Sequence, residues 1–401
     1  MSKNLKPFQP GANLYFHIPF CLKKCRYCYF YSIEKQKNKA IWRYLDYLEK
    51  EIIFKKQQWQ FPKKIKTVYI GGGTPTYLSL PLLKKLFGIL YKYFDINSGI
   101  EFTVEINPMA CDKEKLAFIK QQGVNRLSFG IQTVDKRILN LVGRIFNQRK
   151  AEELIECAKK LKFKTVNLDF MFRLPGQSQK SLAADIKFIK KVRPTSVYWY
   201  ETKNVTEFMK KINRLRVILP YRTADDFIEK SLEKLGYRRL MTEFYTKDNK
   251  PCEYTFDWLS NEYVISFGPF AISKMKNKFY KNVADLKSYY SYLNKNKLPI
   301  FDYFQLNKNE YAVSHFTYLI RFGAVDLNFL SRRFGVKLEG LLSKEIALLV
   351  GLKFLRQEGN KLFLTHKGLV YTPETQIILL IKYKNFLKNL NFFLGRGYNL
   401  R

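Results

Sequence analysis

The chain has 401 residues, 46% of them hydrophobic, and a formal net charge of +37. This length allows two or three domains, and the apolar content supports a sizeable buried core, which excludes an extensively disordered chain. No apolar run reaches the roughly 18 residues of a membrane span, and residues 1–10 lack the pattern of a signal peptide. We therefore expect a cytoplasmic protein whose six cysteines stay reduced and available for metal binding.

The positive charge comes from lysine and arginine residues, 71 in number against 34 acidic residues. Such a charge favours nucleic acid, anionic membranes or ligands with several carboxylates. The lysines are scattered through nearly every predicted helix, which favours a solvated basic surface instead. An anionic partner remains the alternative.

Six short apolar stretches alternate with helical patterns in the first half of the chain. The predicted strands are residues 13–18, 65–70, 100–106, 125–131, 165–170 and 196–201. The predicted helices cover about 35–59, 80–93, 113–122, 135–142 and 148–161, with one more after residue 177. This order predicts an α/β fold of parallel strands joined by right-handed crossovers. Because the alternation breaks near residue 203, we expect a partial (βα)6 barrel.

The second half gives weaker signals. We expect a helix over 224–235 and strands over 237–245 and 263–273, with a turn at Gly268-Pro269. From about 308, helical patterns lead to a hairpin over 353–365 that turns at Gly359-Asn360, an order that predicts an α+β winged-helix-like cap. The expected domains are a barrel (1–205), its extension (206–305), the cap (306–375) and a helical tail (376–401).

Three cysteines, Cys21, Cys25 and Cys28, follow the first predicted strand with the spacing C-x3-C-x2-C. Cysteine thiolate is the usual ligand of iron–sulfur clusters, and three thiolates leave one iron of a 4Fe–4S cluster open for another ligand. A zinc site would need a fourth ligand close by, and His17 is the only histidine near the triplet. A lone histidine among apolar residues is more often structural than catalytic.

The stretch from Tyr15 to Cys28 resembles the radical S-adenosylmethionine (SAM) superfamily. Within it, the chain is similar to the oxygen-independent coproporphyrinogen III oxidase family, which includes a haem chaperone and methyltransferase-like relatives. The likeness covers about 13–275 and 308–370. It implies that Cys21, Cys25 and Cys28 hold a 4Fe–4S cluster and that SAM binds the open iron, where its reduction yields a 5′-deoxyadenosyl radical.

Further motifs at the ends of predicted strands match the family, and all polar motifs should meet at the carboxyl edge of the sheet. They are the glycine motif at 71–75, the strand at 104–108, the stretch 123–132, Gly143-Arg144 and the stretch 167–177. Glycines allow close approach of a ligand, and a guanidinium suits the carboxylate of SAM. The resemblance implies one or two bound SAM molecules, contacted by Tyr15, Tyr27, Gly72, Gly73, Thr74, Glu105, Gln132, Arg144, Asp169 and Ile272.

The sequence departs from the family pattern at two places that bear on which reaction the protein carries out. Family members that decarboxylate coproporphyrinogen carry a fourth cysteine two residues after the third, where this chain has Phe30. Residues 252–255 also depart from the Cys-x-His-Asn motif of the haem chaperone, whereas residues 268–273 are closer to the oxidase.

The resemblance implies a radical SAM enzyme that acts on a tetrapyrrole by oxidative decarboxylation or methyl transfer, with a haem chaperone as the alternative. A reductant such as flavodoxin or ferredoxin is the implied partner. Nucleic-acid binding by the cap is discounted because the charge is spread over the whole chain.

Overall fold

A twelve-stranded sheet runs through the part of the chain that the computed structural model describes, which is residues 11–202, 206–215, 220–260, 262–380 and 382–383. Its centre is a block of parallel strands in the spatial order β11 (Tyr263–Phe267), β1 (Ala12–Ile18), β4 (Ile65–Gly72), β5 (Glu101–Ile106), β6 (Arg126–Gln132), β7 (Thr165–Phe172) and β8 (Ser196–Glu201). The six strands predicted in the first half are confirmed, and the α/β architecture with a central parallel sheet is as expected.

The seventh parallel strand, β11, comes from far along the chain and pairs with β1 from Ala12 opposite Tyr263 to Phe16 opposite Phe267. The chain turns at Gly268-Pro269, as expected, and the stretch predicted as strand over 263–273 therefore forms two strands, β11 and the antiparallel β12 (Ile272–Met275). The turn depends on Gly268, whose φ is +98° and where a Cβ would come within 2.6 Å of the Tyr44 hydroxyl. Strands β13 (Lys278–Asn282) and β14 (Ile300–Gln305) extend this edge.

The opposite edge of the sheet is also antiparallel. Strand β8 pairs with β10 (Phe244–Thr246), which pairs with β9 (Arg238–Met241). The prediction of one strand over 237–245 was wrong: the segment is a hairpin, because the chain turns at Thr242, whose carbonyl accepts hydrogen bonds from the Arg239 side chain. The helix predicted before it is confirmed as α8 (Tyr221–Glu233).

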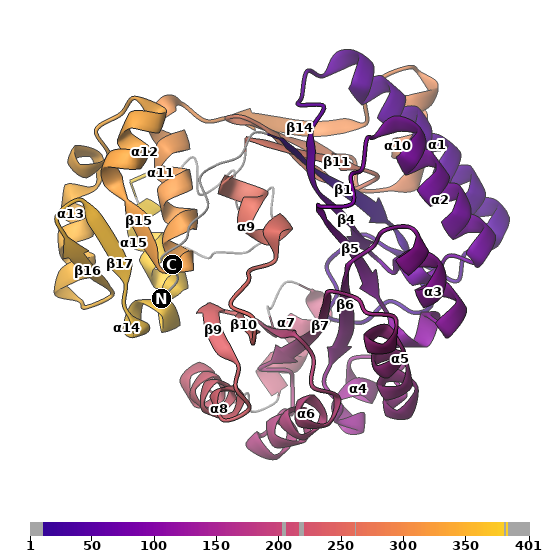
Figure 1. Ribbon diagram of the computed structural model, residues 1–401, viewed down its shortest axis with the longest axis horizontal. Coiled ribbons are helices and arrows are strands. Elements are labelled where there is room, and N and C mark those ends of the chain that lie inside the picture. Colours follow the sequence, from indigo (N-terminus) through magenta and orange to yellow (C-terminus); the bar gives the residue numbers. More distant parts are fainter. Residues whose placement is uncertain (1–10, 203–205, 216–219, 261, 381, 384–401) are drawn as a thin grey trace.

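Helices cover one side of the curved sheet (Figure 1). They are α1 (Asn38–Gln58), α2 (Leu80–Tyr93), α3 (Lys113–Gln121), α4 (Lys136–Leu141), α5 (Gln148–Lys160) and α6 (Gln179–Val192). Helix α5 illustrates their formation: Asn147 caps its first turn, and Ala151, Leu154, Ile155 and Ala158 recur at helical spacing and are buried. All six helices occur where the sequence predicts them.

The two faces of the parallel strands differ in chemistry because side chains alternate along each strand. In β6, Leu127, Phe129 and Ile131 enter the hydrophobic core under the helices. Arg126 and Ser128 lie on the other face, where they are also buried. Polar residues thus line the concave side of the sheet, where α9 (Glu253–Ser260) also lies (Figure 1).

The C-terminal module, residues 308–364, packs around a second hydrophobic core, to which Phe279 of β13, Phe304 of β14 and Leu379 also contribute. Its elements are α11 (Lys308–Leu319), β15 (Ala324–Asp326), α12 (Leu327–Phe334), α13 (Leu338–Gly351), β16 (Leu355–Glu358) and β17 (Lys361–Leu364). The predicted hairpin is present, and β15 adds a third strand to it, which is the element order of a winged helix. The domain boundaries remain a prediction, and most of the expected tail lies outside the described residues. None of the described helices is long and apolar enough to cross a membrane.

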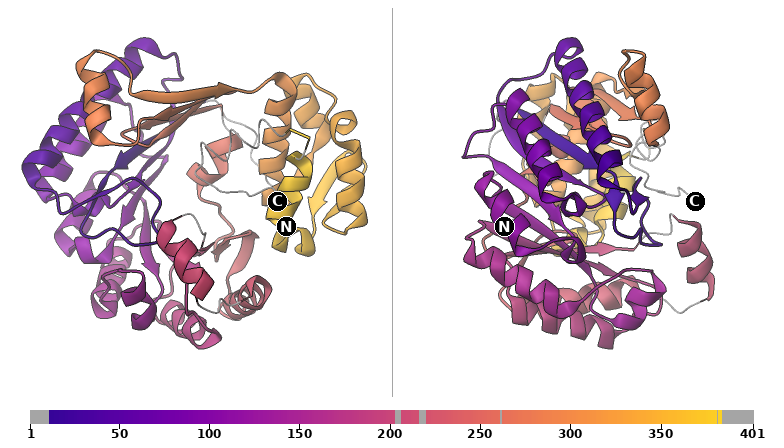
Figure 2. Two further views of the ribbon diagram at one scale, coloured as in Figure 1. Left: turned by 180° about the vertical axis from the view of Figure 1, so that it is seen from behind. Right: turned by 90° about the vertical axis from the view of Figure 1, so that its right-hand side faces the viewer.

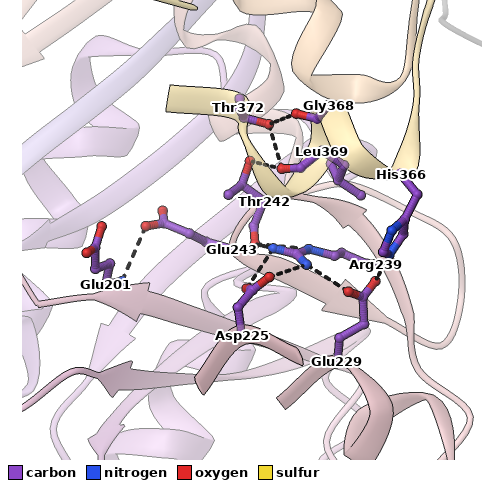
Figure 3. A network of polar contacts seen from close by, with 10 residues as sticks. All are labelled: Glu201, Asp225, Glu229, Arg239, Thr242, Glu243, His366, Gly368, Leu369 and Thr372. Carbon is purple, nitrogen blue, oxygen red and sulfur yellow. Dashed lines mark hydrogen bonds and ion pairs between the residues drawn. The ribbon is translucent and has the colours of Figure 1, made fainter. Parts of the chain in front are cut away.

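A buried ion network at the edge of the sheet is contacted by the segment that follows this module (Figure 3). Arg239 in β9 forms ion pairs of 2.9 and 3.0 Å with Asp225 and Glu229 of α8. From the C-terminal side, His366 in α14 (His366–Val370) contacts Glu229, and the carbonyl of Leu369 accepts a hydrogen bond from Thr242. Helix α15 (Thr372–Leu380) follows, and the remaining described strands and α-helices are β2 (Phe20–Cys21), β3 (Ile33–Glu34), α7 (Glu207–Leu215) and α10 (Leu286–Asn294).

Candidate active site

The three cysteines lie on the loop between β1 and α1, at the carboxyl end of the parallel strands. Cys21 ends the short strand β2, and the backbone N–H of Cys28 donates to the carbonyl of Cys25 at 3.0 Å. Two residues from other segments reach the loop: the Thr74 hydroxyl, just after β4, lies 3.5 Å from the Cys21 sulfur, and the Arg144 Nη1, in the loop after α4, lies 3.5 Å from the Cys25 sulfur. The predicted convergence of these motifs is thus present.

Burial favours the protonated form of two of the cysteine thiols. Burial raises the pKa of Cys21, and it raises the pKa of Cys28 to about 11, so both thiols keep their protons at neutral pH until a metal replaces them. Among the described residues, no three His, Cys, Asp or Glu side chains are arranged to hold a single metal ion. Thiolates that bind three different irons of a cluster stand farther apart than the ligands of one ion.

The glycine motif after β4 leaves no room for side chains. A Cβ on Gly71 would lie 2.7 Å from the Glu105 carboxyl carbon, and one on Gly72 would lie 2.5 Å from the His17 ring. A Cβ on Gly73 would approach the carbonyls of Ile18 and Phe20 to 2.8 Å. Glycine is therefore required here for close packing of β4 against β1 and the cysteine loop, a reason that sequence reasoning alone did not supply.

Glu105 lies at the end of β5, with its carboxylate held by two donors. The Tyr69 hydroxyl donates at 2.8 Å and the Gly72 backbone N–H at 3.1 Å. Burial raises the pKa of Glu105 to about 7 in spite of these bonds. A cationic group of a ligand beside this carboxylate would favour its ionised form.

Asp169 on β7 has a similar environment. Ser128 and Asn167 donate to its two oxygens at 2.9 and 2.8 Å. Burial raises the pKa of Asp169 to about 6. Both carboxylates therefore point to the concave side, from strands β5 and β7 with β6 between them, and are held there by neutral donors.

Arg144, Gln132 and Tyr27 come together around Gly130. Arg144 donates to the carbonyl of Gly130, and a Cβ on Gly130 would lie 3.1 Å from Arg144 and 3.2 Å from Gln132. The Tyr27 hydroxyl lies 3.4 Å from Arg144. Gln132 has a φ of +73° at a break in the register between β6 and β7, which turns it out of the regular strand. The Arg144 Nε is buried without a hydrogen-bond partner among the described residues.

His17 is a structural residue, as its sequence context favours. Its Nε2 donates to the Tyr31 carbonyl at 2.9 Å, so its Nδ1 is the acceptor of the Tyr15 hydroxyl at 3.1 Å. Burial lowers the pKa of His17 to about 4, and the ring is neutral at neutral pH. Its role is to orient Tyr15.

Sequence reasoning missed several residues of this site. Tyr69, Ser128 and Asn167 hold the two carboxylates, and each lies two positions before a motif residue, so the period of two along a strand could have revealed them. Tyr254 in α9 stacks on Tyr15 with ring centroids 6.1 Å apart, and no local sequence signal places it there.

Ile272 is a predicted site residue that contacts the C-terminal module. It lies in β12, and its half-buried side chain packs against the core of the C-terminal module. Its assignment to SAM binding remains a prediction.

Helix α7 lies beside the cysteine loop (Figure 2, left). The Thr206 hydroxyl donates to the Arg26 carbonyl at 2.9 Å, and the Arg26 guanidinium lies 5.2 Å from the centre of the Phe208 ring. The loop is therefore contacted both by strand ends and by this helix.

Comparison with known proteins agrees with this geometry. Residues 15–189 match the family model of the Radical SAM superfamily. The chain is 30% identical over 364 residues to the heme chaperone HemW of Bacillus subtilis (88% of this chain, 95% of the relative), and 26% identical over 295 residues to the oxygen-independent coproporphyrinogen III oxidase of Escherichia coli (69% and 64%). The solved structure of the latter enzyme, HemN, matches with a TM-score of 0.82 at 21% identity, covering 92% of this chain and 90% of that one.

The residues at the strand ends fit the cofactors of that family, a 4Fe–4S cluster and SAM. The thiols stand on one loop, the buried Arg144 keeps an unpartnered Nε, and two carboxylates face the same side from adjacent regions of the sheet. The chain belongs to the radical SAM superfamily and, within it, to the family that includes HemW and HemN.

Proposed function

We propose that this protein is a haem chaperone that binds haem beside a 4Fe–4S cluster and SAM and passes it to another protein. Phe30 carries the proposal, because it replaces the fourth cysteine of the resembling decarboxylating oxidases. The match to a heme chaperone over 95% of that relative supports it.

Different residues would hold the cluster and the SAM molecule. Cys21, Cys25 and Cys28 would hold the cluster, and when bound it would supply one electron to SAM. Arg144 suits the SAM carboxylate, because a guanidinium can donate two parallel hydrogen bonds. Glu105, fixed by Tyr69 and Gly72, suits the amino group. A flavodoxin or ferredoxin would supply the electron.

A second candidate is the oxidative decarboxylation of a tetrapyrrole by a radical enzyme. The observation in its favour is the segment 268–273, which is closer to the version found in the oxidases. Under this alternative the radical formed at the cluster acts on the porphyrinogen, and haem is not a ligand.

An anaerobic experiment separates the two. The cluster is reconstituted, and haem binding is followed by the Soret band while 5′-deoxyadenosine and porphyrin products are measured with SAM, reductant and coproporphyrinogen III. A chaperone binds haem and leaves coproporphyrinogen unchanged. Conversion of coproporphyrinogen to a decarboxylated product would overturn the proposal, as would failure to bind haem. Cys21→Ala is the control and should lose the brown absorbance of the cluster.

A further inference from the structure

Two exposed aromatic side chains directly after Cys28 form a group with one half-buried aromatic ring from the turn after β11. Tyr29 and Phe30 are 37% and 39% exposed and stack on each other with ring centroids 4.4 Å apart. Phe30 also meets Phe270 edge-on at 6.4 Å. These three residues are called the aromatic platform below. Adjacent exposed aromatic residues on a monomer are typical of a binding surface.

The platform is anchored at both ends. On the N-terminal side, the backbone of Cys28 bonds to Cys25. On the C-terminal side, the Tyr31 carbonyl accepts from His17 and its hydroxyl accepts from the backbone of Leu286 at 3.0 Å. Because both flanking residues are held, Tyr29 and Phe30 are presented to solvent by the fold.

Phe270 contributes its ring to the platform from a strained backbone conformation. It has a φ of +64°, which is unusual for a bulky residue, and its N–H donates to the Val283 carbonyl at 2.8 Å. This conformation brings a ring from the turn between β11 and β12 next to the cysteine loop. The turn contributes an aromatic ring here although a smaller residue would fit the backbone better.

A lysine side chain lies beside the Phe270 ring of the platform. The Lys281 Nζ in β13 is 5.2 Å from the centre of the Phe270 ring, with Asp302 as its cross-strand neighbour. Flat aromatic surface with an adjacent ammonium group matches a planar conjugated ligand that carries carboxylates at its edge.

We propose that the aromatic platform is where the haem of the proposed function rests, with one macrocycle face on the outer side of the stacked Tyr29–Phe30 pair and a propionate near Lys281. This inference rests on the proposed function and adds the place where haem binds. It also gives Phe30 a role in binding, because an aromatic ring next to the cluster, at the position of the fourth cysteine, would provide surface for the macrocycle.

The test is haem titration of the reconstituted full-length protein, followed by the Soret band and by quenching of intrinsic fluorescence. We expect Tyr29→Ser combined with Phe30→Ala to weaken haem binding at least tenfold, while Phe30→Tyr stays within threefold of the wild type. The control is Phe301→Ala with Tyr303→Ser, two exposed aromatic residues of β14 (61% and 63% exposed), which should change affinity less than twofold. Cluster absorbance and SAM binding report that the variants are folded.

The propionate contact is tested with Lys281→Gln, and with Lys278→Gln on the same strand as control. Lys281→Gln should weaken binding of haem about threefold and leave that of haem dimethyl ester unchanged. If wild type binds haem and the platform variants bind it equally well, the location is wrong while the proposed function stands. If those variants instead slow cluster reduction by flavodoxin with haem affinity unchanged, the platform serves the reductant and the inference is overturned. Failure of the wild type to bind haem refutes both.

Discussion

Two groups of carboxylates in this molecule, one buried and one half-buried, are balanced in opposite ways. At the edge of the sheet, Asp225 and Glu229 share the guanidinium of Arg239, at 2.9 and 3.0 Å, and all three side chains are at least nine-tenths buried (Figure 3). At the candidate active site, Glu105 and Asp169 are held by hydroxyl, amide and backbone donors that are all neutral.

The difference separates a structural network from a binding site. A buried carboxylate that is paired with a cation inside the protein is complete. Burial raises the pKa of a carboxylate in both groups, of Asp225 as well as of Glu105 and Asp169, so the direction of the pKa shift does not separate them. Glu105 and Asp169 differ because their hydrogen-bond donors are all neutral, which leaves them able to pair with positive charge on a ligand. Four predictions test this difference between the two groups of carboxylates.

The largest effect is expected from Arg239→Met. It leaves two carboxylates buried without their cation, and we expect a loss of about 3–5 kcal/mol in the free energy of unfolding. Urea denaturation of the cluster-free protein measures it. Arg149→Met removes an exposed i,i+4 ion pair with Glu153 and should change stability by less than about 0.5 kcal/mol. A similar small loss for Arg239→Met would mean that the network is not structural.

The pH dependence of stability should have the sign set by the active-site carboxylates. The folded protein binds the protons of these two carboxyl groups more tightly than the unfolded chain does. The groups therefore stabilise the folded state fully below about pH 4. This stabilisation is lost as pH rises through about 6 for Asp169 and about 7 for Glu105. With ordinary carboxyl pKa values of about 4, the loss is on the order of 3 kcal/mol for each of the two groups. Glu105→Gln combined with Asp169→Asn should flatten this slope between pH 5 and 7.5. An unchanged slope in that double variant would assign the titration to other groups.

Glu105→Gln alone should weaken SAM binding about tenfold, which corresponds to about 1.4 kcal/mol, with the melting temperature unchanged or raised. Calorimetry on the reconstituted protein at pH 8 measures the affinity. In the wild type the affinity should rise as pH increases through about 7, where Glu105 ionises, and the variant should lose this dependence. Tyr93→Phe removes a hydroxyl that donates to Glu49 away from the site and serves as the control; equal effects of both changes would contradict the role of Glu105.

The smallest effect is expected from His366→Asn. The His366 side chain is 70% exposed, although it contacts Glu229 at 3.2 Å. Exposed partners contribute little, so we expect a change below about 0.5 kcal/mol. A loss above about 1 kcal/mol, beyond the usual range for an exposed pair, would place His366 among the essential members of the network.

Local patterns in the sequence account for much of this fold. Short apolar runs bounded by glycine or proline predict the strands, and the helical spacing of residues such as Leu154 and Ile155 predicts the helices on one face. The position of polar motifs after strands predicts their convergence, which the contacts of Thr74 and Arg144 with the cysteine loop confirm.

Other features depend on pairing between distant segments, which leaves no local signal. The partner of β1 is found more than half a chain away in β11, and the hairpin at 238–246 depends on Arg239 being buried by α8. Tyr254 reaches Tyr15 only because α9 lies on the concave side. Such contacts are set by tertiary structure and cannot be read from periodicity.

The distance in sequence between β1 and β11 also affects the order of events during synthesis. The cysteine loop leaves the ribosome early, yet β1 lacks one of its two neighbours until residues 263–267 have been made. At roughly 5–20 residues per second, that interval lasts on the order of tens of seconds. For this time the nascent chain presents three thiols beside a half-paired strand, which is a period when iron and sulfide can reach the loop before the sheet is complete.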